Sequence, residues 1–348
     1  MKALVYNGPG KRSWTEKPKP KLKDARDAIV AITHTTICGT DLHILKGDVP
    51  EVHKGLTLGH EGVGIVTEIG AGVWKFKVGD KALISCITSC GMCQPCRTGM
   101  YSHCEVGGWM LGHTIDGTQA DFVRIPYADT SLYHVPDGVD DEVMVMLSDI
   151  LPTGFEVGVL NGAVKPGDVI AIIGAGPIGL AVLLTSQFYS PAEIIVVDPD
   201  SNRLAKAKAL GATMLIQNSK ASPVDEIMKF THGKGVDVAI EAVGIPATFD
   251  ICQSIVTAGG RIANVGVHGK SVELHLEKLW SENVTITTGL VDTVSTAMLL
   301  ENVKSGKLKP EQLITHHFDL SKIMEAYDTF ANAGKEKALK IILKGATP

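Results

Sequence analysis

One glycine motif constrains the fold of this chain more than any other sequence feature, Gly174-Ala-Gly176-Pro-Ile-Gly179. A continuous apolar run, 169–173, precedes it and a helical pattern, 177–189, follows it, which predicts a tight turn from a strand into a helix. The first glycine allows the turn, the second lets a pyrophosphate approach the backbone, and the third lets helix and strand pack closely. We therefore predict a dinucleotide-binding unit, with cofactor contacts from Gly174, Gly176, Pro177, Ile178 and Gly179.

The hydrophobic pattern divides the chain into a β-rich part and an alternating part. Residues 1–149 show short β-rich runs between Gly, Pro and Asp turns, at 28–32, 63–69 and 81–85. After residue 165 apolar strands alternate with helices, which predicts a doubly wound parallel sheet. The predicted strands are 169–173, 193–198, 214–216, 236–240, 261–267 and 285–290, and the helices 177–189, 201–210, 224–230 and 248–256. We expect domains at 1–152 and 153–289, with 290–348 (helices 294–303 and 321–332, strand 338–343) returning to the first.

Asp198 follows the second strand of the alternating part, 24 positions after Gly174. A carboxylate there accepts hydrogen bonds from the ribose hydroxyls and repels a 2′-phosphate, so we predict NAD as the cofactor. Asp200 adds negative charge beside it. Arg203 favours the opposite choice, since a guanidinium can hold a phosphate; we expect it to flank the adenine or to pair with Asp198.

Four cysteines lie in one short loop, in a lobe of about residues 86–108. Two C-x2-C steps and a fourth cysteine provide the closed thiolate set that structural Zn²⁺ prefers. A disulfide framework would need an oxidising compartment, and an iron–sulfur cluster is disfavoured because the last cysteine is spaced more widely than in the bacterial ferredoxin run. We predict a structural zinc held by Cys90, Cys93, Cys96 and Cys104.

Composition excludes several other classes of function. The chain has 348 residues, a net charge of −5 and no basic block, so no nucleic-acid partner is expected. The longest apolar stretch, 169–185, is broken by the glycine motif, so no membrane span is expected, and the first residues do not resemble a signal peptide. We expect a cytoplasmic protein in which Cys86 and Cys252 fill small apolar spaces.

A second set of metal-binding residue types lies in the β-rich part. Cys38, His60 and the neighbouring Glu61 offer a thiolate, an imidazole and a carboxylate, as in an open catalytic zinc site. Asp149 is a further candidate ligand at the predicted domain boundary. Each has an ordinary alternative: Cys38 as a small core residue, His60 and Glu61 as a surface pair, and Asp149 as a helix cap.

Together these features resemble the zinc-dependent medium-chain alcohol dehydrogenases over essentially the full length. The matching elements are Cys38-Gly-Thr-Asp-Leu-His43, Gly59-His-Glu-Gly62, Val78-Gly-Asp80, the cysteine loop and the glycine motif. The resemblance implies an α/β fold, with a β-rich GroES-like catalytic domain and a Rossmann nucleotide-binding domain. It also implies two Zn²⁺ per chain, the second bound by Cys38, His60 and Asp149. Glu61 matches a residue that approaches or binds this metal in some members.

The resemblance also implies a mechanism. A zinc-bound alkoxide would pass a hydride to the nicotinamide. Thr40 would accept the alcohol's proton and pass it through the ribose hydroxyl to His43, for which a surface loop histidine is the alternative, while Asp41 would orient the ligand histidine. Thr153, Val265, Gly266 and Val267 are expected along the nicotinamide, and Trp109 at the pocket wall.

The predicted function is reversible, NAD-dependent oxidation of primary and secondary alcohols to aldehydes and ketones. A threonine or polyol dehydrogenase with the same machinery is the main alternative. A zinc-ribbon interaction module is disfavoured by the acidic charge and the complete glycine motif, and a zinc-free quinone reductase by the presence of Cys38 and His60. An exposed edge strand at 285–290 would favour dimers, and the resemblance implies a homotetramer, a dimer of dimers.

Overall fold

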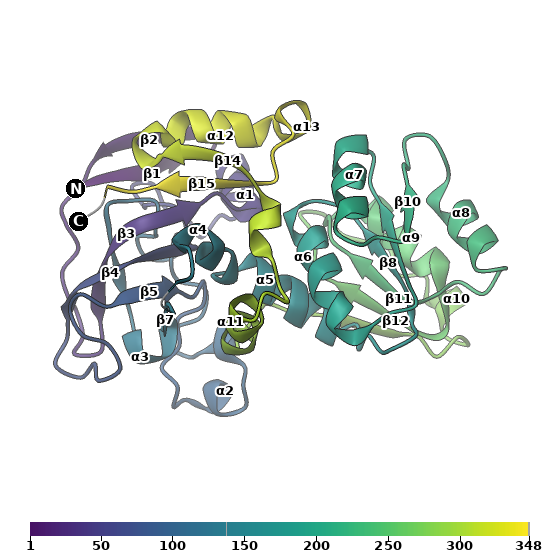
Figure 1. The fold of residues 1–348 in the computed structure, drawn as a ribbon, viewed down its shortest axis with the longest axis horizontal. Coiled ribbons are helices and arrows are strands. Elements are labelled where there is room, and N and C mark those ends of the chain that lie inside the picture. Colours follow the sequence, from purple (N-terminus) through teal and green to yellow (C-terminus); the bar gives the residue numbers. More distant parts are fainter. Residues whose placement is uncertain (137, 347–348) are drawn as a thin grey trace. The chain divides into compact units, whose positions relative to one another are not determined.

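The computed structural model describes residues 1–136 and 138–346. The chain forms two compact units (Figure 1): a β-rich unit of Met1–Asp149 with Asp292–Pro348, and a parallel-sheet unit of Ile150–Val291. The expected domain boundaries, after residues 152 and 289, lie within a few residues of the points where the chain passes from one unit to the other, after Asp149 and after Val291. The chain therefore leaves the β-rich unit once, builds the second unit and returns.

The β-rich unit is built around a mixed sheet with the order β14-β15-β3-β4-β5-β7, in which β6 also pairs with β3. The pairs around β3 are antiparallel, and β14 and β15 run parallel. A hairpin of β1 and β2 stands beside it. The strands are β1 Lys2–Gly8, β2 Lys11–Glu16, β3 Ala28–Thr36, β4 Gly62–Ile69, β5 Lys81–Ile84, β6 Phe122–Ile125, β7 Leu132–His134, β14 Ile314–Asp319 and β15 Lys340–Lys344.

Helices in this unit are short, as the turn-rich sequence predicts. Two of them, α1 and α12, share a core cluster with strands from both ends of the chain, through residues such as Leu4, Ile44, Tyr327 and Ile341. The helical segments are α1 Gly39–Lys46, α2 Gln94–Arg97, η1 Tyr101–His103, α3 Ala128–Ser131, α4 Asp141–Met144, η2 Val145–Leu147, α11 Thr296–Lys304, η5 Pro310–Leu313, η6 Leu320–Lys322, α12 Ile323–Ala331 and α13 Ala333–Glu336.

The second unit is a parallel sheet with the order β10-β9-β8-β11-β12-β13. Its central strands β8, β9 and β11 are largely buried, as in β8 (Val-Ile-Ala-Ile-Ile). They are β8 Val169–Ile173, β9 Glu193–Val197, β10 Met214–Ile216, β11 Val236–Glu241, β12 Val256–Asn264 and β13 Thr285–Thr288. The helical segments are α5 Ile150–Thr153, the π-helical η3 Gly154–Leu160, α6 Pro177–Ser186, η4 Gln187–Tyr189, α7 Ser201–Ala209, α8 Pro223–Phe230, α9 Pro246–Ile255 and α10 Leu276–Leu279.

Local signals in the sequence explain where these helices start. Proline occupies the first turn of α6, α8 and α9, where its missing N–H costs nothing. Asp200 caps α7 by accepting hydrogen bonds from the backbone N–H groups of Asn202 and Arg203. The alternation of strand and helix confirms the predicted doubly wound α/β fold.

Two features of the fold differ from what the sequence pattern predicts. The predicted strand 261–267 begins earlier and ends at Asn264, opposite Glu241, the last residue of β11, whose carbonyl oxygen accepts from the backbone N–H groups of Val265 and Gly266. The consecutive helical turns Asp141–Leu160 are long and apolar enough to span a membrane by length and composition alone. However, 83% of that window is buried in the fold, which is the burial of a core helix.

Candidate functional site

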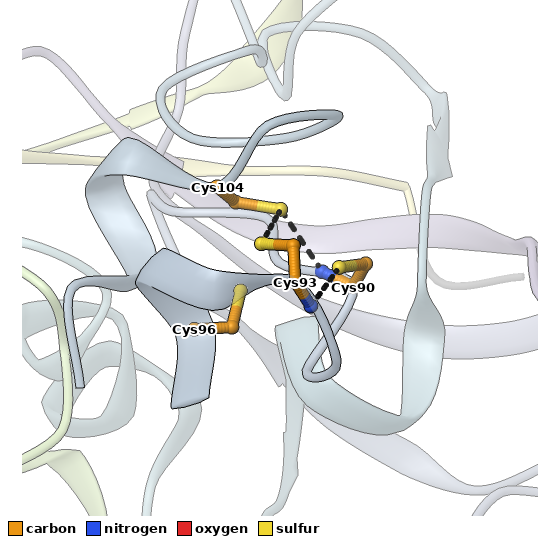
Figure 2. Close-up of side chains that lie close together, drawn as sticks. All are labelled: Cys90, Cys93, Cys96 and Cys104. Carbon is orange, nitrogen blue, oxygen red and sulfur yellow. Dashed lines mark hydrogen bonds between the residues drawn. The ribbon is translucent and has the colours of Figure 1, made fainter. Parts of the chain in front are cut away.

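The four cysteines of the loop converge on one point. Figure 2 shows the side chains of Cys90, Cys93, Cys96 and Cys104 turned toward a common centre. Their ligand atoms lie within 4.8 Å of one another, and Cys93 Sγ lies 3.9 Å from Cys104 Sγ. Thiolates around tetrahedral zinc stand about 3.7 Å apart, given Zn–S bonds of about 2.3 Å. This cysteine lobe (residues 90–104) therefore fits zinc.

Backbone amides support the cysteine lobe. The N–H groups of Met92 and Cys93 point at Cys90 Sγ (3.5 and 3.4 Å), and the N–H of Cys90 points at Cys104 Sγ (3.3 Å). Backbone hydrogen bonds from Cys96 and Glu105 lower the pKa of Cys93 to about 7. Burial raises the pKa of Cys96 to about 12. The loop thus stabilises the thiolate of Cys93, and a bound dication would be needed to ionise Cys96.

Cys38, His60, Glu61 and Asp149 form a second cluster, with ligand atoms within 4.8 Å of one another. Cys38 Sγ lies 3.5 Å and His60 Nε2 lies 3.2 Å from Asp149 Oδ2, which matches the edges of a tetrahedral zinc site, about 3.3–3.8 Å. Cys38 caps α1, His60 precedes β4, and Asp149 follows η2. The hydroxyl of Ser148 bonds both backbone groups of Gly62 and so joins the Asp149 segment to the His60 segment.

This cluster is buried and electrostatically poised for a cation. Burial, reinforced by Asp149, raises the pKa of the Cys38 thiol. Burial disfavours protonated His60, but hydrogen bonds with Asp149 and Cys38 outweigh it and raise the pKa of His60 well above its usual value. A bound dication would replace these protons.

Two unpartnered atoms indicate how His60 would be held. Among the described residues, the buried Nδ1 of His60 and Oδ1 of Asp41 make no hydrogen bond, and they face each other at 3.9 Å. If Nε2 binds a metal, the proton must sit on Nδ1, where a carboxylate is the usual acceptor. The predicted role of Asp41 therefore has a geometric basis.

Glu61 is engaged by a residue that the sequence did not reveal. Lys340, the first residue of β15, places Nζ 2.6 Å from Glu61 Oε2 and 3.0 Å from Oε1, and both side chains are 1% exposed. Burial raises the pKa of Glu61 to about 7, opposed by Lys340. Burial alone would lower the pKa of Lys340, but Glu61 reverses the effect and raises it. Glu61 is thus held beside the predicted metal ligands by a buried cation.

Aromatic and sulfur side chains surround the cluster. The Trp109 ring stands edge-on to His60, with centroids 6.2 Å apart, and stacks on His113 at 4.2 Å. Cys86, which the sequence suggested was a space filler, is buried and places its Sγ 3.8 Å from Asp149 Oδ1. No local sequence pattern indicates a position near the cluster for Cys86, because its place beside Asp149 depends on the pairing of β5 in the sheet.

The expected relay residues lie on α1. Thr40 Oγ1 is 3.7 Å from Cys38 Sγ. His43 Nδ1 is 2.8 Å from Asp48 Oδ2, and the His43 side chain is 31% exposed. Asp48 therefore favours the tautomer with the proton on Nδ1, which leaves Nε2 free to accept a proton.

The glycine motif has the geometry of a phosphate-binding turn. Gly174 has φ +106°, and a Cβ there would meet Val243 Cγ2 at 2.5 Å. A Cβ on Gly179 would collide with the Gly174 carbonyl oxygen. Around Gly176 the space is open, and the nearest atom to a Cβ would be Arg203 Nη1 at 3.9 Å. The contacts at Gly174 and Gly179 agree with the tight turn and the close helix–strand packing predicted for them, and the open space at Gly176 is compatible with the predicted approach of a pyrophosphate.

Asp198 follows β9 beside this turn. It accepts hydrogen bonds from the backbone N–H groups of Ala175 and Asp200, both at 2.8 Å, and Arg203 Nη1 lies 3.9 Å from its Oδ2. Val265, Gly266 and Val267 follow β12 at the same carboxyl edge of the sheet, where Gly266 packs against Glu241. Thr153 ends α5. Ligands of doubly wound sheets bind at this edge.

Comparisons with known proteins agree with this architecture. Residues 24–137 match the model of the alcohol dehydrogenase GroES-like domain, and residues 177–300 match that of the zinc-binding dehydrogenases. An alcohol dehydrogenase of Cupriavidus necator is 35% identical, over 99% of this chain and 98% of that protein.

Solved structures show the same likeness. Zinc-dependent alcohol dehydrogenase 2 from Streptococcus pneumoniae superposes with a TM-score of 0.96 and 53% identity, covering 100% of this chain and 99% of the other. An alcohol dehydrogenase from Escherichia coli CFT073, solved with NADH, has a TM-score of 0.89 and 27% identity, covering 99% of each chain. The chain is thus similar to these proteins over both of its units.

Proposed function

Because this chain belongs to the zinc-type alcohol dehydrogenases of the medium-chain dehydrogenase/reductase superfamily, we propose that it interconverts alcohols with aldehydes and ketones, using NAD. The observation that carries the proposal is the buried convergence of Cys38, His60 and Asp149 beside Thr40. The proposed ligands of a catalytic Zn²⁺ are these three residues. Glu61 is a further candidate ligand, and its carboxylate is paired with Lys340 in this structure. A second Zn²⁺ is assigned to the cysteine lobe.

The chain's own residues bind, orient and move protons in this scheme. Zinc, when bound, polarises the substrate oxygen and lowers the pKa of its hydroxyl, and NAD supplies the hydride acceptor. Thr40 Oγ1 would accept the released proton while giving up its own hydroxyl proton, and His43 Nε2 would accept a proton on the way to solvent, with its ring held by Asp48. Asp41 holds His60 in the ligating tautomer.

The choice of NAD rests on Asp198. Relatives have been solved with NADH and with NADP, so the residues of this chain must decide. Asp198 is 3% exposed and held by two backbone N–H groups, and a fixed carboxylate repels a 2′-phosphate while accepting ribose hydroxyls. Arg203 is assigned to the carboxylate and the pyrophosphate beside Gly176. We expect Asp198→Gly to lower the NAD over NADP ratio of kcat/KM by about 10–100-fold; equal use of both cofactors by the wild type would refute the assignment.

Primary and secondary alcohols are the proposed substrates. The apolar ring of Trp109 stands close to His60, and one methylene in such a pocket changes specificity by only about 1–3 kcal/mol, so several alcohols should react. The decisive experiment follows NADH release with straight, branched and aromatic alcohols, threonine and a polyol. Activity confined to threonine or to the polyol would assign the chain to that class instead.

The proposed assembly is a dimer formed through the parallel-sheet units, and two dimers forming a tetramer. In the described sheet β13 stands at the edge with β12 as its neighbour. The apolar side chains Leu274, Leu276, Trp280 and Leu290 are exposed close to it in sequence, and edge strands are usually covered. A monomeric mass in sedimentation at micromolar concentration would contradict this assembly.

A further inference from the structure

Three buried polar side chains connect the carboxyl-terminal helix α12 to helix α1. The hydroxyl of Tyr327, on α12, donates to Gln119 Oε1 at 2.8 Å. Gln119 Nε2 donates in turn to Asp41 Oδ2 at 3.0 Å. Asp41 is 1% exposed, and Tyr327 and Gln119 are fully buried. Water therefore does not compete for these bonds, and each bond is worth more than it would be at the surface.

The orientation of the Gln119 amide is determined by its partners. Its Nε2 has a second acceptor, the Thr36 carbonyl oxygen at 3.1 Å, so both amide hydrogens are used. A flipped amide would turn its oxygen toward the Asp41 carboxylate and toward the Thr36 carbonyl, two repulsive contacts. Tyr327 stabilises the observed orientation because its hydroxyl hydrogen is directed at the amide oxygen.

Gln119 also touches the backbone next to His60. Gly59 has φ +94°, and a Cβ there would lie 2.6 Å from Gln119 Cγ. The same Asp41 oxygen that accepts from Gln119 also accepts from the backbone N–H of Cys38, at 2.9 Å. Asp41 Oδ1 faces His60 Nδ1. Gln119 therefore packs beside the segment that carries His60, and through Asp41 it is linked to the segment that carries Cys38.

We propose that Tyr327 and Gln119 are positioning residues for the catalytic metal: by fixing Asp41 they set the orientation of Cys38 and His60. The inference rests on the proposed zinc site at Cys38, His60 and Asp149. The hydroxyl of Tyr327 is not explained by packing alone, since phenylalanine would fill the same core. The ring of Tyr327 is itself anchored by the Arg12 guanidinium, 4.9 Å from the ring centroid, and Arg12 pairs with Asp328 at 2.6 Å.

The test measures zinc retention rather than turnover alone. Wild type, Gln119→Leu, Tyr327→Phe and the double variant are exposed to a chelator, and the loss of each zinc is timed. Mutation of the direct hydrogen-bond partner of a metal ligand, the position of Asp41, typically changes metal affinity by about 10–100-fold, so residues that act through Asp41 should have effects at the lower end of this range or below it. We expect the catalytic zinc to leave about tenfold faster from Gln119→Leu and about threefold faster from Tyr327→Phe. The zinc of the cysteine lobe should leave at the wild-type rate.

Matched controls separate positioning from general loss of stability. Gln253→Leu removes another buried amide, which bonds Glu273 O and the His275 N–H in the other unit. Tyr133→Phe removes a hydroxyl that donates to Thr293 O within the β-rich unit. Neither should change release of the catalytic zinc. Because Tyr327 acts on Asp41 only through its hydrogen bond to Gln119, the double variant should lose zinc no faster than Gln119→Leu.

The outcomes are distinguishable. A wild-type protein that holds no zinc outside the cysteine lobe would refute the proposed function itself. Two zincs in the wild type, with unchanged release in Tyr327→Phe and Gln119→Leu, would overturn this inference alone. So would equal acceleration of both zincs, or multiplied effects in the double variant. Tyr327→Phe, which removes one oxygen atom, keeps the test available if Gln119→Leu fails to fold. With Co²⁺ in place of zinc, a changed absorption spectrum in Tyr327→Phe is the expected confirmation, and an unchanged one counts against the inference.

Discussion

The two proposed metal sites of the β-rich unit differ in how far along the chain their ligands are collected. The cysteine lobe takes all four from residues 90–104, whereas Cys38, His60 and Asp149 come from three separate segments. Closing a short loop costs less entropy than bringing distant segments together. The lobe can therefore form from local structure, while the catalytic cluster depends on the completed sheet.

Their supports differ in the same way. Backbone N–H groups surround the sulfurs of the lobe, so most of its support does not depend on neighbouring side chains. The catalytic cluster is instead supported by side chains: Asp41, Lys340 and Ser148. This difference is consistent with a structural role for the proposed lobe site and a catalytic role for the proposed cluster site.

The largest effect is expected from Cys38→Ala. A catalytic metal supplies several kcal/mol of stabilisation, so kcat should fall by about a thousandfold or more. The thermal unfolding of the variant should remain close to that of the wild type. Steady-state kinetics and calorimetry on the same preparation test this, and the comparison fails if the variant keeps its activity or loses its fold.

Cys93→Ser should give the opposite result. Loss of a structural zinc site removes binding energy that is also folding energy, so the free energy of unfolding should fall by several kcal/mol. Molecules that remain folded at low temperature should keep most of their turnover. Denaturant titration and active-site-normalised kinetics measure the two parts; full stability without the lobe zinc would show that the lobe is dispensable.

Lys340→Met tests the side-chain support of the catalytic cluster. Removing one partner of a buried ion pair leaves an uncompensated charge, and the expected loss is about 3–5 kcal/mol in the free energy of unfolding. Adding Glu61→Gln should restore most of it. Lys19→Met, at the half-exposed pair with Glu68, is the matched control and should cost about 1 kcal/mol or less. Equal losses in the two lysine variants would contradict the importance of burial.

The smallest effect concerns proton release on zinc binding. At pH 7 the raised pKa values of Cys96 and Cys104 keep their thiols protonated, and Cys93 titrates at about 7. From Cys93, Cys96 and Cys104 the lobe should release about two to three protons per zinc, and the catalytic cluster about two, from Cys38 and His60. Zinc affinity should therefore weaken more steeply at the lobe as pH falls. The number of protons released is measured by calorimetric titration with zinc in buffers of different ionisation enthalpy. Cys38→Ala reports on the lobe alone and Cys93→Ser on the catalytic cluster alone. Equal dependence of the binding heat on the buffer's ionisation enthalpy in the two variants would contradict this prediction.

Sequence patterns predicted the local parts of this molecule well. The parallel-sheet unit follows from apolar strands that alternate with helices, and the glycine turn from residues adjacent in sequence. The cysteine lobe is equally local. Each of these depends on spacing over a few tens of residues, which one sequence displays directly.

Long-range contacts could not be predicted in the same way. Nothing near Lys340 or Tyr327 in the sequence indicates a metal site, and their proposed roles arise from β15 pairing with β3 and from α12 packing into the same core cluster as α1. β14 was missed as well, because its exposed and half-buried residues include two adjacent histidines and lack an apolar run. Pairing partners far apart in the chain leave no local periodicity.

The return of the chain to its first unit has a consequence for biosynthesis. The ribosome produces Cys38, His60 and Asp149 long before Tyr327 and Lys340, and the whole parallel-sheet unit emerges in between. Domains fold largely in the order of their synthesis. The nascent chain therefore carries the proposed metal ligands before it carries their supports, and β15 can pair with β3 only after the last residues are made. We expect the proposed catalytic metal site to be completed only at the end of translation.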